Sequence, residues 1–430
     1  MHKQTRDVIV VGFALFAMFL GAGNLIFPPS LGFITGDNWI LAMFGFLLTG
    51  VGMPLLGIIA VSRAGGTVDH LANKVNPVFA KILGAMIMLA IGPLLAIPRT
   101  GATTFEIGIQ PLFPEVSSIL VSIIFFSITL FFSLNPTNVV DKIGKVLTPC
   151  LLIVLGIIIY KGVTAPLGLP VTTNLGQTFS IGFTEGYQTM DALGSVILAG
   201  IVISSIVQRG YTNTKDQIKL TIQAGLIAAI GLGVVYGGLI YLGATASGLF
   251  TTDTTKSQLI IGITQELLGS FGTVALAISV SLACLTTSIG LTATAGEYFN
   301  KLSNGRLSYK SIVIATVVFS GVFANIGVEK IVRLAIPILV TLYPIVIVLI
   351  VMNIFDVYIP RKSAYPGAVF GALIVSLFDA LSTVGIEFSY ITNLIARLPL
   401  ANQGFGWLIP AVVGTMVTMI FIKPRQKQHL

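Results

Sequence analysis

The sequence predicts an all-α integral membrane protein with twelve membrane-spanning helices, of which the first and the sixth are discontinuous. Composition is the first observation behind this prediction, since 55% of the 430 residues are hydrophobic, 9% are charged and the mean hydropathy is +0.96. Soluble domains carry about 25% charged residues. The second observation is a series of twelve apolar segments. The third is that glycine, proline and polar residues interrupt two of these segments.

The twelve apolar segments are separated by short polar stretches, too short for a separate soluble domain. An apolar helix needs about 20 residues to cross a bilayer. We predict spans at residues 8–34, 39–62, 78–105, 117–134, 142–162, 178–207, 220–247, 270–299, 311–325, 331–353, 364–385 and 405–422. Short interfacial helices are expected at residues 63–77 and 256–269.

The positions of lysine and arginine predict that both chain ends face the cytoplasm, because basic residues near span ends are retained on that side. With the N-terminus inside, eighteen of the 24 basic residues fall in inner segments and Arg99 falls within a span. The outer segments hold five, namely Lys161, Lys256, Lys330, Arg333 and Arg397. A basic inner face suits anionic membrane lipid. The net charge of +8 therefore implies no nucleic acid.

The first apolar run has a second interpretation, a signal peptide, because a basic start precedes residues 8–20 and small residues follow. Against this, apolar character resumes at once in LIFPPSLGFI. Cleavage would also leave an odd number of spans and spoil the charge distribution. We therefore expect a membrane span here.

The first span is interrupted at FLGAGNLIFPP, residues 19–29. From Val8 to Leu20 there are 13 residues, or about 20 Å of helix, whereas the hydrocarbon core is roughly 30 Å thick. Backbone groups exposed by a break at this depth need protein or a polar cavity to satisfy them. Glycine permits close approach of a ligand, and the proline pair limits how the helix resumes after Phe27. The stretch thus predicts either a polar binding site or a packing kink.

The sixth span carries a similar interruption at GYQTMD, residues 186–191. Five spans separate the two breaks, and this odd offset places the second set of five upside down relative to the first. An inverted repeat whose discontinuous helices meet at a midplane site has this pattern. We therefore expect a first repeat at residues 1–162, a second at 178–353, and two further helices with a cytoplasmic tail at 354–430. The prediction rests on topology, because the halves show no clear residue-level similarity.

Three charged residues in or next to the predicted spans are candidates for function. Asp191 lies near the centre of the sixth span, where an ionised carboxylate costs several kcal/mol unless a partner compensates it. The alternative to a functional role is a structural one, in which Asp191 bonds a neighbouring group at the break. Arg99 and Glu106 are seven residues apart in the third span and project from one helix face. They are candidates for a gate, although Arg99 could equally snorkel outward and Glu106 lies near the outer end. Asn24, in the first break, can turn its amide to a substrate or cap the second half-helix.

The eighth span concentrates hydroxyl groups in LACLTTSIGLTATAG, residues 282–296. Hydroxyls and carbonyls are oxygen ligands for a small hard cation, whereas such side chains often bond only their own backbone. Enzymatic chemistry has no visible site, because the three histidines lie outside the spans and no HExxH, GxSxG or Walker motif occurs.

Four strings resemble one family over the whole chain: GAGNLIFPP at 21–29, GPLLAIPRTGATTFE at 92–106, GYQTMDALG at 186–194 and IPILVTLYP at 336–344. They are similar to the bacterial branched-chain amino acid:cation symporters of the BrnQ type, within the amino acid, polyamine and organocation superfamily. The resemblance implies a fold of five-plus-five inverted repeats like that of the bacterial leucine transporter, with two added helices. It also implies uptake of leucine, isoleucine and valine across the bacterial cell membrane, driven by a cation gradient that is usually Na+. No cofactor besides the coupling ion and no obligate protein partner is expected.

The resemblance assigns roles to both breaks. The substrate carboxylate would approach the N-terminal end of the second half of helix one, where free N–H groups favour an anion. Four residues would line that point, namely Gly21, Ala22, Gly23 and Asn24. The ammonium group would meet the unwound backbone of helix six around Gly186, Tyr187 and Thr189, together with Asp191. The walls of the apolar side-chain pocket are not identifiable.

The resemblance also implies a cation site between helices one and eight. Carbonyls of Ala17 and Leu20 would join the carbonyl of Ala283 and the hydroxyls of Thr286 and Thr287. A register one residue later would use Cys284, Thr287 and Ser288. Thr287 belongs to both registers and is our choice for the cation.

Three alternatives remain at this stage. Within transport, the nearest is a proton-coupled carrier of another small neutral amino acid. A channel is disfavoured because paired breaks suggest an occluded pocket, and a membrane-embedded enzyme has little support from Asp191, Arg99 and Glu106.

Overall fold

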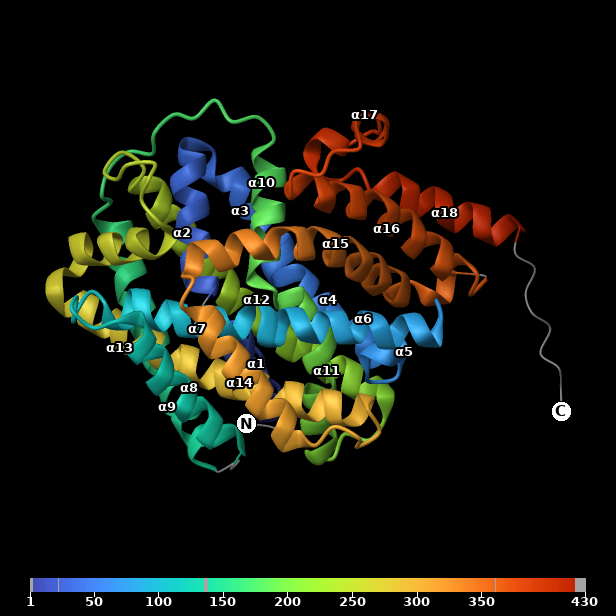
Figure 1. The fold of residues 1–430 in the computed structure, drawn as a ribbon, viewed down its shortest axis with the longest axis horizontal. Coiled ribbons are helices and arrows are strands. Elements are labelled where there is room, and N and C mark those ends of the chain that lie inside the picture. The colour runs from blue at the N-terminus through green and yellow to red at the C-terminus, as the bar shows by residue number, and fades with distance from the viewer. Residues whose placement is uncertain (1–2, 22, 135–137, 360, 422–430) are drawn as a thin grey trace.

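Every regular element in the computed structural model is a helix across the described residues, which are 3–21, 23–134, 138–359 and 361–421 (Figure 1). Within these ranges seven helical runs are long and apolar enough to cross a membrane, namely Gly23–Ala64, Pro77–Ile109, Asp191–Gln208, Thr214–Thr245, Lys256–Leu302, Val328–Ile354 and Ala364–Thr383. Shorter apolar helices occupy Ser118–Leu134, Pro149–Thr164, Tyr309–Ala324 and Leu408–Phe421. The predicted class, an all-helical membrane protein, is confirmed.

Each of the twelve predicted spans coincides with helix. The first six correspond to α1 (Lys3–Phe19) with α2 (Gly23–Thr35), α3 (Trp39–Leu47) with α4 (Met53–Ala64), α6 (Pro77–Leu89) with α7 (Ala96–Thr103), α8 (Ser118–Leu134), α9 (Asn138–Thr164), and α10 (Thr178–Glu185) with α11 (Asp191–Gln208). The others correspond to α12 (Thr214–Thr245), α13 (Lys256–Leu302), α14 (Tyr309–Ala324), α15 (Val328–Ile354), α16 (Ala364–Thr383) and α18 (Leu408–Phe421). The number of membrane crossings stays a prediction, and residue 422, the predicted end of the last span, lies outside the described residues.

Two short helices lie between the long ones. Helix α5 (Val68–Ala72) occupies the stretch where an interfacial helix was expected, and α17 (Ser389–Ala396) was not predicted. The other expected segment, 256–269, forms the first part of α13 and ends at a bend, because Gly269 has a non-helical φ of 62°. A positive φ is accessible to glycine at little cost.

The break in the first span separates α1, which ends at Phe19, from α2, which begins at Gly23. Pro28 and Pro29, which were expected to limit how the helix resumes after Phe27, lie inside α2. Each proline removes one N–H from the helical ladder. Membrane helices tolerate this where neighbouring groups satisfy the freed carbonyls.

The break in the sixth span lies at the predicted residues. Helix α10 ends at Glu185, one turn of 3-10 helix covers Gly186–Thr189, and α11 begins at Asp191. Met190 connects the turn to α11 with a left-handed φ of 61°. A bulky residue rarely adopts this conformation, so the backbone changes direction sharply at the break.

The two discontinuous helices run in opposite directions side by side. Helix α2 contacts α10 and α1 contacts α11, and Figure 1 shows α2 and α10 in the upper part of the view with α1 and α11 below them. Both halves of helix one pack on α12. In the same way, the two halves of helix six pack on helix two, α10 on α3 and α11 on α4. This reciprocal packing is what the predicted inverted repeat requires; the repeat itself stays a prediction.

Glycines allow the closest of these helix contacts. A side chain at Gly32 of α2 would strike the carbonyl of Ile240 in α12, and one at Gly182 of α10 would strike the carbonyl of Ala42 in α3. Small residues at membrane helix interfaces let backbones approach this closely. The half-helices α2 and α10 are therefore held against their neighbours by backbone-to-backbone contact.

Helix three has a bend that was not predicted. Gly92 has non-helical dihedral angles, φ −98° and ψ −120°, and Pro93 follows it between α6 and α7. The Gly-Pro pair is a recognisable sequence signal for such a bend. It lies seven residues before Arg99, so α7 departs from the direction of α6 before it reaches the centre of the molecule.

The last two long helices lie to one side of the rest. Helix α16 packs against α15 and α18 packs against α16, and Figure 1 shows both at the right of the view. Neither contributes a residue to the central cavity described below.

Candidate functional site

A cavity of about 70 Å³ lies where the two discontinuous helices meet. Its walls come from four places: the break in helix one, the break in helix six, helix three around α7, and α13. The lining residues are Met18, Phe19, Gly21, Gly23, Asn24, Ile91, Ala96, Arg99, Thr100, Thr189, Met190, Asp191, Gly194, Leu198, Thr287 and Leu291. The cavity thus combines apolar walls with one cationic, one anionic and several neutral polar groups.

Asn24 joins the two breaks. The residue is 1% exposed. Its side-chain amide donates to the Phe19 carbonyl at 2.8 Å and to Asp191 Oδ2 at 2.5 Å, and contacts the Tyr236 hydroxyl. Asn24 therefore satisfies a carbonyl that the end of α1 leaves without a helical partner. Asn24 is the second residue of α2, and its amide nitrogen bonds the end of the first half-helix.

Asp191 is the first residue of α11 and is 8% exposed. Its backbone N–H donates to Thr189 Oγ1 at 3.3 Å, and that hydroxyl donates to the Gly186 carbonyl at 2.9 Å. A carboxylate at a helix N-terminus is stabilised by the free N–H groups there. The break in helix six thus holds an acidic side chain at the cavity, as the sequence predicted.

Arg99 of α7 points into the same cavity and is 4% exposed. Its Nη1 donates to the Gln188 carbonyl at 2.7 Å, and its Cζ lies 5.2 Å from the centre of the Phe27 ring. A side chain on Gly23 would approach Nη2 to 2.6 Å, so the guanidinium lies directly against the start of α2. Outward snorkelling of Arg99 is therefore wrong.

Glu106, the other gate candidate, is held elsewhere. It accepts hydrogen bonds from Ser257 Oγ at 2.6 Å and from the backbone N–H of Val328 at 2.8 Å. These contacts tie helix three to the starts of α13 and α15. The structure does not bring Arg99 and Glu106 together, so a gate formed by this pair has no geometric basis.

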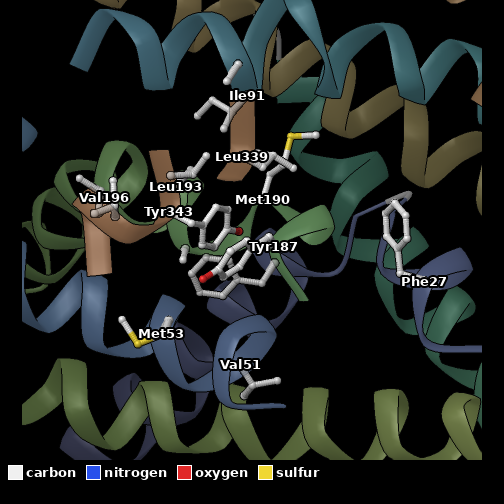
Figure 2. Close-up of a cluster of buried hydrophobic side chains, with 14 of the residues drawn as sticks. Phe27, Val51, Met53, Ile91, Tyr187, Met190, Leu193, Val196, Leu339 and Tyr343 are labelled. Atoms are coloured by element: carbon white, nitrogen blue, oxygen red, sulfur yellow. The ribbon is translucent and has the colours of Figure 1, made fainter. Parts of the chain in front are cut away.

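Tyr187 lies beside the cavity, among buried apolar side chains. Its ring stacks on that of Tyr343 with centroids 4.1 Å apart and an interplanar angle of 19°, and Figure 2 shows the pair next to Met190 and Leu193. Neither Tyr187 nor Gly186 is among the lining residues. Of the predicted helix-six residues, Thr189 and Asp191 reach the cavity.

The candidate cation ligands of α13 differ in what their side chains do. The Thr286 hydroxyl donates to the Ala283 carbonyl at 3.0 Å, and Ser288 accepts from Thr129 Oγ1 of α8 at 3.2 Å. Thr287 lines the cavity, and its hydroxyl has no hydrogen-bond partner within the described part of the chain. On helix one, Ala17 and Leu20 flank the lining residues Met18 and Phe19.

The predicted residues of the first break also differ in position. Gly21, Gly23 and Asn24 line the cavity. Ala22 lies outside the described residues. The break therefore contributes three of its four predicted residues to the described cavity.

Apolar walls are the part of the site that sequence reasoning missed. They include Met18, Ile91, Ala96, Leu198 and Leu291. Helical spacing offered a partial signal, because Leu291 follows Thr287 by four residues and lies on the same helix face. Thr287 was predicted from the sequence, but the helices that face it across the cavity were not.

Two ion pairs that the sequence did not predict lie on opposite sides of the breaks. Lys256 Nζ at the start of α13 is 2.8 Å from Glu185 Oε1 of α10 and 2.9 Å from Ser30 Oγ of α2. On the side of α1 and α11, Arg209 Nη1 is 3.1 Å from Asp7 Oδ1. The half-helices are thus tied together on both sides of the cavity.

Two solved structures share this fold. Mhp1, a nucleobase-cation-symport-1 family transporter with bromovinylhydantoin bound, superposes with a TM-score of 0.61 at 14% identity, over 96% of this chain and 92% of Mhp1. A Na+-coupled sialic acid symporter in a substrate-bound outward-open state superposes with a TM-score of 0.58 at 13% identity, over 97% and 91%. The molecule is an all-helical membrane protein whose fold neighbours are leucine-transporter-like secondary transporters.

Sequence comparison then defines the family. The model of the branched-chain amino acid transport protein family matches residues 4–425. The branched-chain amino acid permease BraB of Bacillus subtilis (strain 168) is 40% identical over 98% of this chain and 97% of its own length. BrnQ of Escherichia coli (strain K12) is 33% identical over 99% and 98%. The chain belongs to the branched-chain amino acid transport protein family, which confirms the resemblance; it is a carrier and not an enzyme.

Proposed function

We propose that this protein takes up leucine, isoleucine and valine by symport with Na+, through alternating access. The observation that carries the proposal is the cavity between the two breaks, which combines a zwitterion-compatible set of charges with apolar walls and the Thr287 hydroxyl of α13, which has no hydrogen-bond partner among the described residues. Enclosed cavities with a few oriented polar groups are typical of small-molecule sites. The names of the relatives, which are branched-chain amino acid permeases, support this choice of substrate.

In this proposal the substrate backbone lies at the breaks and its side chain lies against Met18, Ile91 and Leu291. The ammonium group faces Asp191 and the backbone around Thr189, and the carboxylate faces the start of α2. Pocket selectivity for one methylene is worth about 1 to 3 kcal/mol. The three branched-chain amino acids would therefore share one site with modest differences in affinity.

The cation is proposed to bind between helix one and α13, with the Thr287 hydroxyl as a ligand. The Thr286 hydroxyl and the Ala283 carbonyl, which are 3.0 Å apart on the same helix, would supply two more oxygen ligands. A cation that binds beside the substrate raises substrate affinity, and the substrate raises cation affinity by the same factor. Coupling of the two fluxes follows from that reciprocity.

Alternating access is proposed to open the two sides of the cavity in turn. The Lys256–Glu185 pair closes the side of α2 and α10, and the Asp7–Arg209 pair closes the side of α1 and α11. One pair would separate in each open state while the other persists. The predicted topology, with both chain ends cytoplasmic in a bacterial cell membrane, makes the first pair extracellular and the second cytoplasmic.

Asp191 supports a second candidate, a proton-coupled carrier of another small neutral amino acid. A buried carboxyl group at a transport site can take up and release a proton, and such groups mark proton pathways in membrane transporters. In that case Asp191, and not Thr287, would determine coupling. The experiment below separates the two candidates.

The test is uptake of radiolabelled leucine into proteoliposomes under an imposed Na+ gradient, a proton gradient or neither, with isoleucine and valine as competitors. We expect Na+-dependent uptake that both competitors reduce and that Thr287→Ala abolishes. Thr294→Ala is the matched control, because Thr294 is on the same helix and its hydroxyl donates to its own backbone at Gly290, 2.8 Å away. Leucine uptake driven by protons alone would keep the substrate, replace Na+ by H+ and shift coupling to Asp191, whereas folded protein that accumulates none of the three amino acids would refute the proposed substrate.

A further inference from the structure

We propose that Arg99 is a substrate-binding residue that pairs with the α-carboxylate of the transported amino acid, opposite in charge to Asp191 in the same cavity. This inference rests on the proposed function and specifies how its site recognises an α-amino acid. From the sequence, we expected the substrate carboxylate to bind backbone groups at the start of α2. The structure adds a guanidinium there.

The two charged side chains share the cavity without forming an ion pair. Arg99 and Asp191 both line it, yet no nitrogen of Arg99 is within the 4.0 Å of a carboxylate oxygen of Asp191 that defines a salt bridge. Charges within a membrane normally pair with each other or face a site of function. A bound zwitterion would pair with both, since its carboxylate and ammonium complement the guanidinium and the carboxylate.

The side chain of Arg99 has hydrogen-bond donors that are available to a ligand. Its Nη1 donates to the Gln188 carbonyl, while Nε and Nη2 donate to no atom in the described ranges. The residue as a whole is 4% exposed. The planar guanidinium presents its N–H groups in a fork that matches the two oxygens of a carboxylate.

The surroundings hold the guanidinium beside the start of α2. The Phe27 ring lies 5.2 Å from Cζ, at cation–π distance, and the backbone of Gly23 lies against Nη2. The first N–H groups of α2 have no helical partner and carry partial positive charge. A carboxylate there would meet both the guanidinium and the helix N-terminus.

An alternative is that Arg99 only fastens the break in helix six through the Gln188 carbonyl. That role predicts loss of stability on substitution but no change in which ligands bind. A carboxylate partner predicts a change in ligand selectivity. Leucinamide, which keeps the ammonium and the side chain of leucine but lacks the carboxylate charge, separates the two roles.

The experiment measures binding of leucine and of leucinamide to the purified full chain in detergent with Na+ present, from the ligand-dependent rise in thermal unfolding midpoint. Wild type should bind leucine at least about 10-fold more tightly than leucinamide. In Arg99→Gln we expect leucine affinity to fall about 10- to 100-fold, as for loss of hydrogen bonds to a charged group, with leucinamide affinity nearly unchanged. Arg397→Gln is the control, because Arg397 is an exposed residue. This variant should keep the wild-type ratio of leucine to leucinamide affinity.

A folded Arg99→Gln protein with the wild-type ratio of affinities would overturn the inference. Wild-type protein that binds both ligands equally would overturn it as well, without any variant. Should Arg99→Gln fail to fold, Arg99→Lys keeps the charge but loses the fork, and an unreduced ratio in that protein would also overturn the inference. Failure of the proposed substrate is distinguishable, since wild type would then neither bind nor accumulate any branched-chain amino acid.

Discussion

The side-chain amide of Asn24 donates to Asp191 at 2.5 Å and so connects the two interrupted helices at the wall of the cavity. The same nitrogen donates to the Phe19 carbonyl at the end of α1. One buried side chain therefore satisfies a carbonyl left by the first break and a carboxylate left by the second. Asn24 therefore contacts both breaks.

Replacing Asn24 by alanine should destabilise the protein, because the Phe19 carbonyl and the Asp191 carboxylate would lose a buried donor. An unsatisfied buried polar group costs about 1 to 3 kcal/mol, so we expect a clear fall in the thermal unfolding midpoint in detergent. Asn325→Ala is the matched control, since Asn325 is exposed and donates to the Gly321 carbonyl at 2.7 Å at the end of α14. Equal midpoints for the two variants would show that the Asn24 contacts contribute nothing.

The glycine contacts of α12 make a second prediction. A methyl group at Gly32 would overlap the Ile240 carbonyl, and backbone cannot move aside as a flexible side chain can. Overpacking of this kind typically costs about 1 to 3 kcal/mol or more. We expect Gly32→Ala to lower the yield of folded protein and its unfolding midpoint.

The control for this packing variant is Gly233→Ala. Gly233 lies in α12, and a side chain there meets nothing within 4 Å. Alanine is preferred over glycine in a helix by up to about 1 kcal/mol, so this variant should be neutral or slightly stabilised. A Gly32→Ala protein as stable as Gly233→Ala would mean that α2 and α12 are not in close contact.

The two ion pairs predict opposite shifts in access to the cavity. Glu185→Gln removes the partner of Lys256 and should favour opening on the side of α2 and α10. Asp7→Asn removes the partner of Arg209 and should favour the side of α1 and α11. Glu387→Gln, at an exposed position, serves as the neutral control.

Access can be measured with a cysteine at Ala96 in the cavity wall, with Cys150 and Cys284 replaced by serine. With the predicted topology, an impermeant maleimide added outside whole cells should label the Glu185→Gln protein faster than the Asp7→Asn protein. Labelling in inside-out vesicles should show the reverse order. The same order in both preparations would contradict closure by these pairs.

Sequence reasoning located the features that depend on local residue chemistry, namely the two breaks and Asp191. Both breaks follow from residues unfavourable to a membrane helix, and Asp191 follows from the cost of a carboxylate at that depth. The same reasoning expected Pro28 and Pro29 to limit how helix one resumes, because it judged them by their effect on an isolated helix. In the molecule, α12 packs closely on α2 and the helix continues through both prolines.

Partners from distant helices could not be predicted in this way. Arg99 and Glu106 share a helix, yet the first turns to Gln188 of helix six and the second to Ser257 of α13. Which side chain faces the cavity depends on how helix three bends at Gly92 and on which helices flank it. Spacing along one helix carries no information about that environment.

Asp356 predicts a pH dependence of stability outside the membrane spans. Partial burial raises the pKa of its carboxyl, and hydrogen bonds from Lys74 and Tyr365 lower it by more, so the pKa lies below its ordinary value of 3.8. A depressed pKa adds stability above pH 3.8, and this is lost as the pH falls through the folded-state value. The Lys74–Asp356 distance is 2.7 Å, and the aspartate is 47% exposed, so the effect should be small.

Thermal unfolding of wild type and Asp356→Asn between pH 3 and pH 6 checks this prediction. The variant should be less stable than wild type at pH 6, and the difference should shrink toward the acid end. A constant difference across the range would exclude titration of Asp356 as its cause.

The wall of the cavity at Ala96 should set the order of preference among the branched-chain amino acids. Ala96 is half-buried and lines the cavity together with Ile91 and Leu291. A valine side chain at position 96 would occupy space that the substrate side chain needs. Leucine as substrate has one more methylene than valine as substrate and would therefore lose more affinity. Because one methylene is worth about 1 to 3 kcal/mol in a hydrophobic pocket, competition assays on Ala96→Val should shift the leucine-to-valine affinity ratio toward valine by about 10-fold. Val318→Ala, at an exposed position on α14, should leave the ratio unchanged. An unaltered ratio in an active Ala96→Val protein would place the substrate side chain against another part of the cavity.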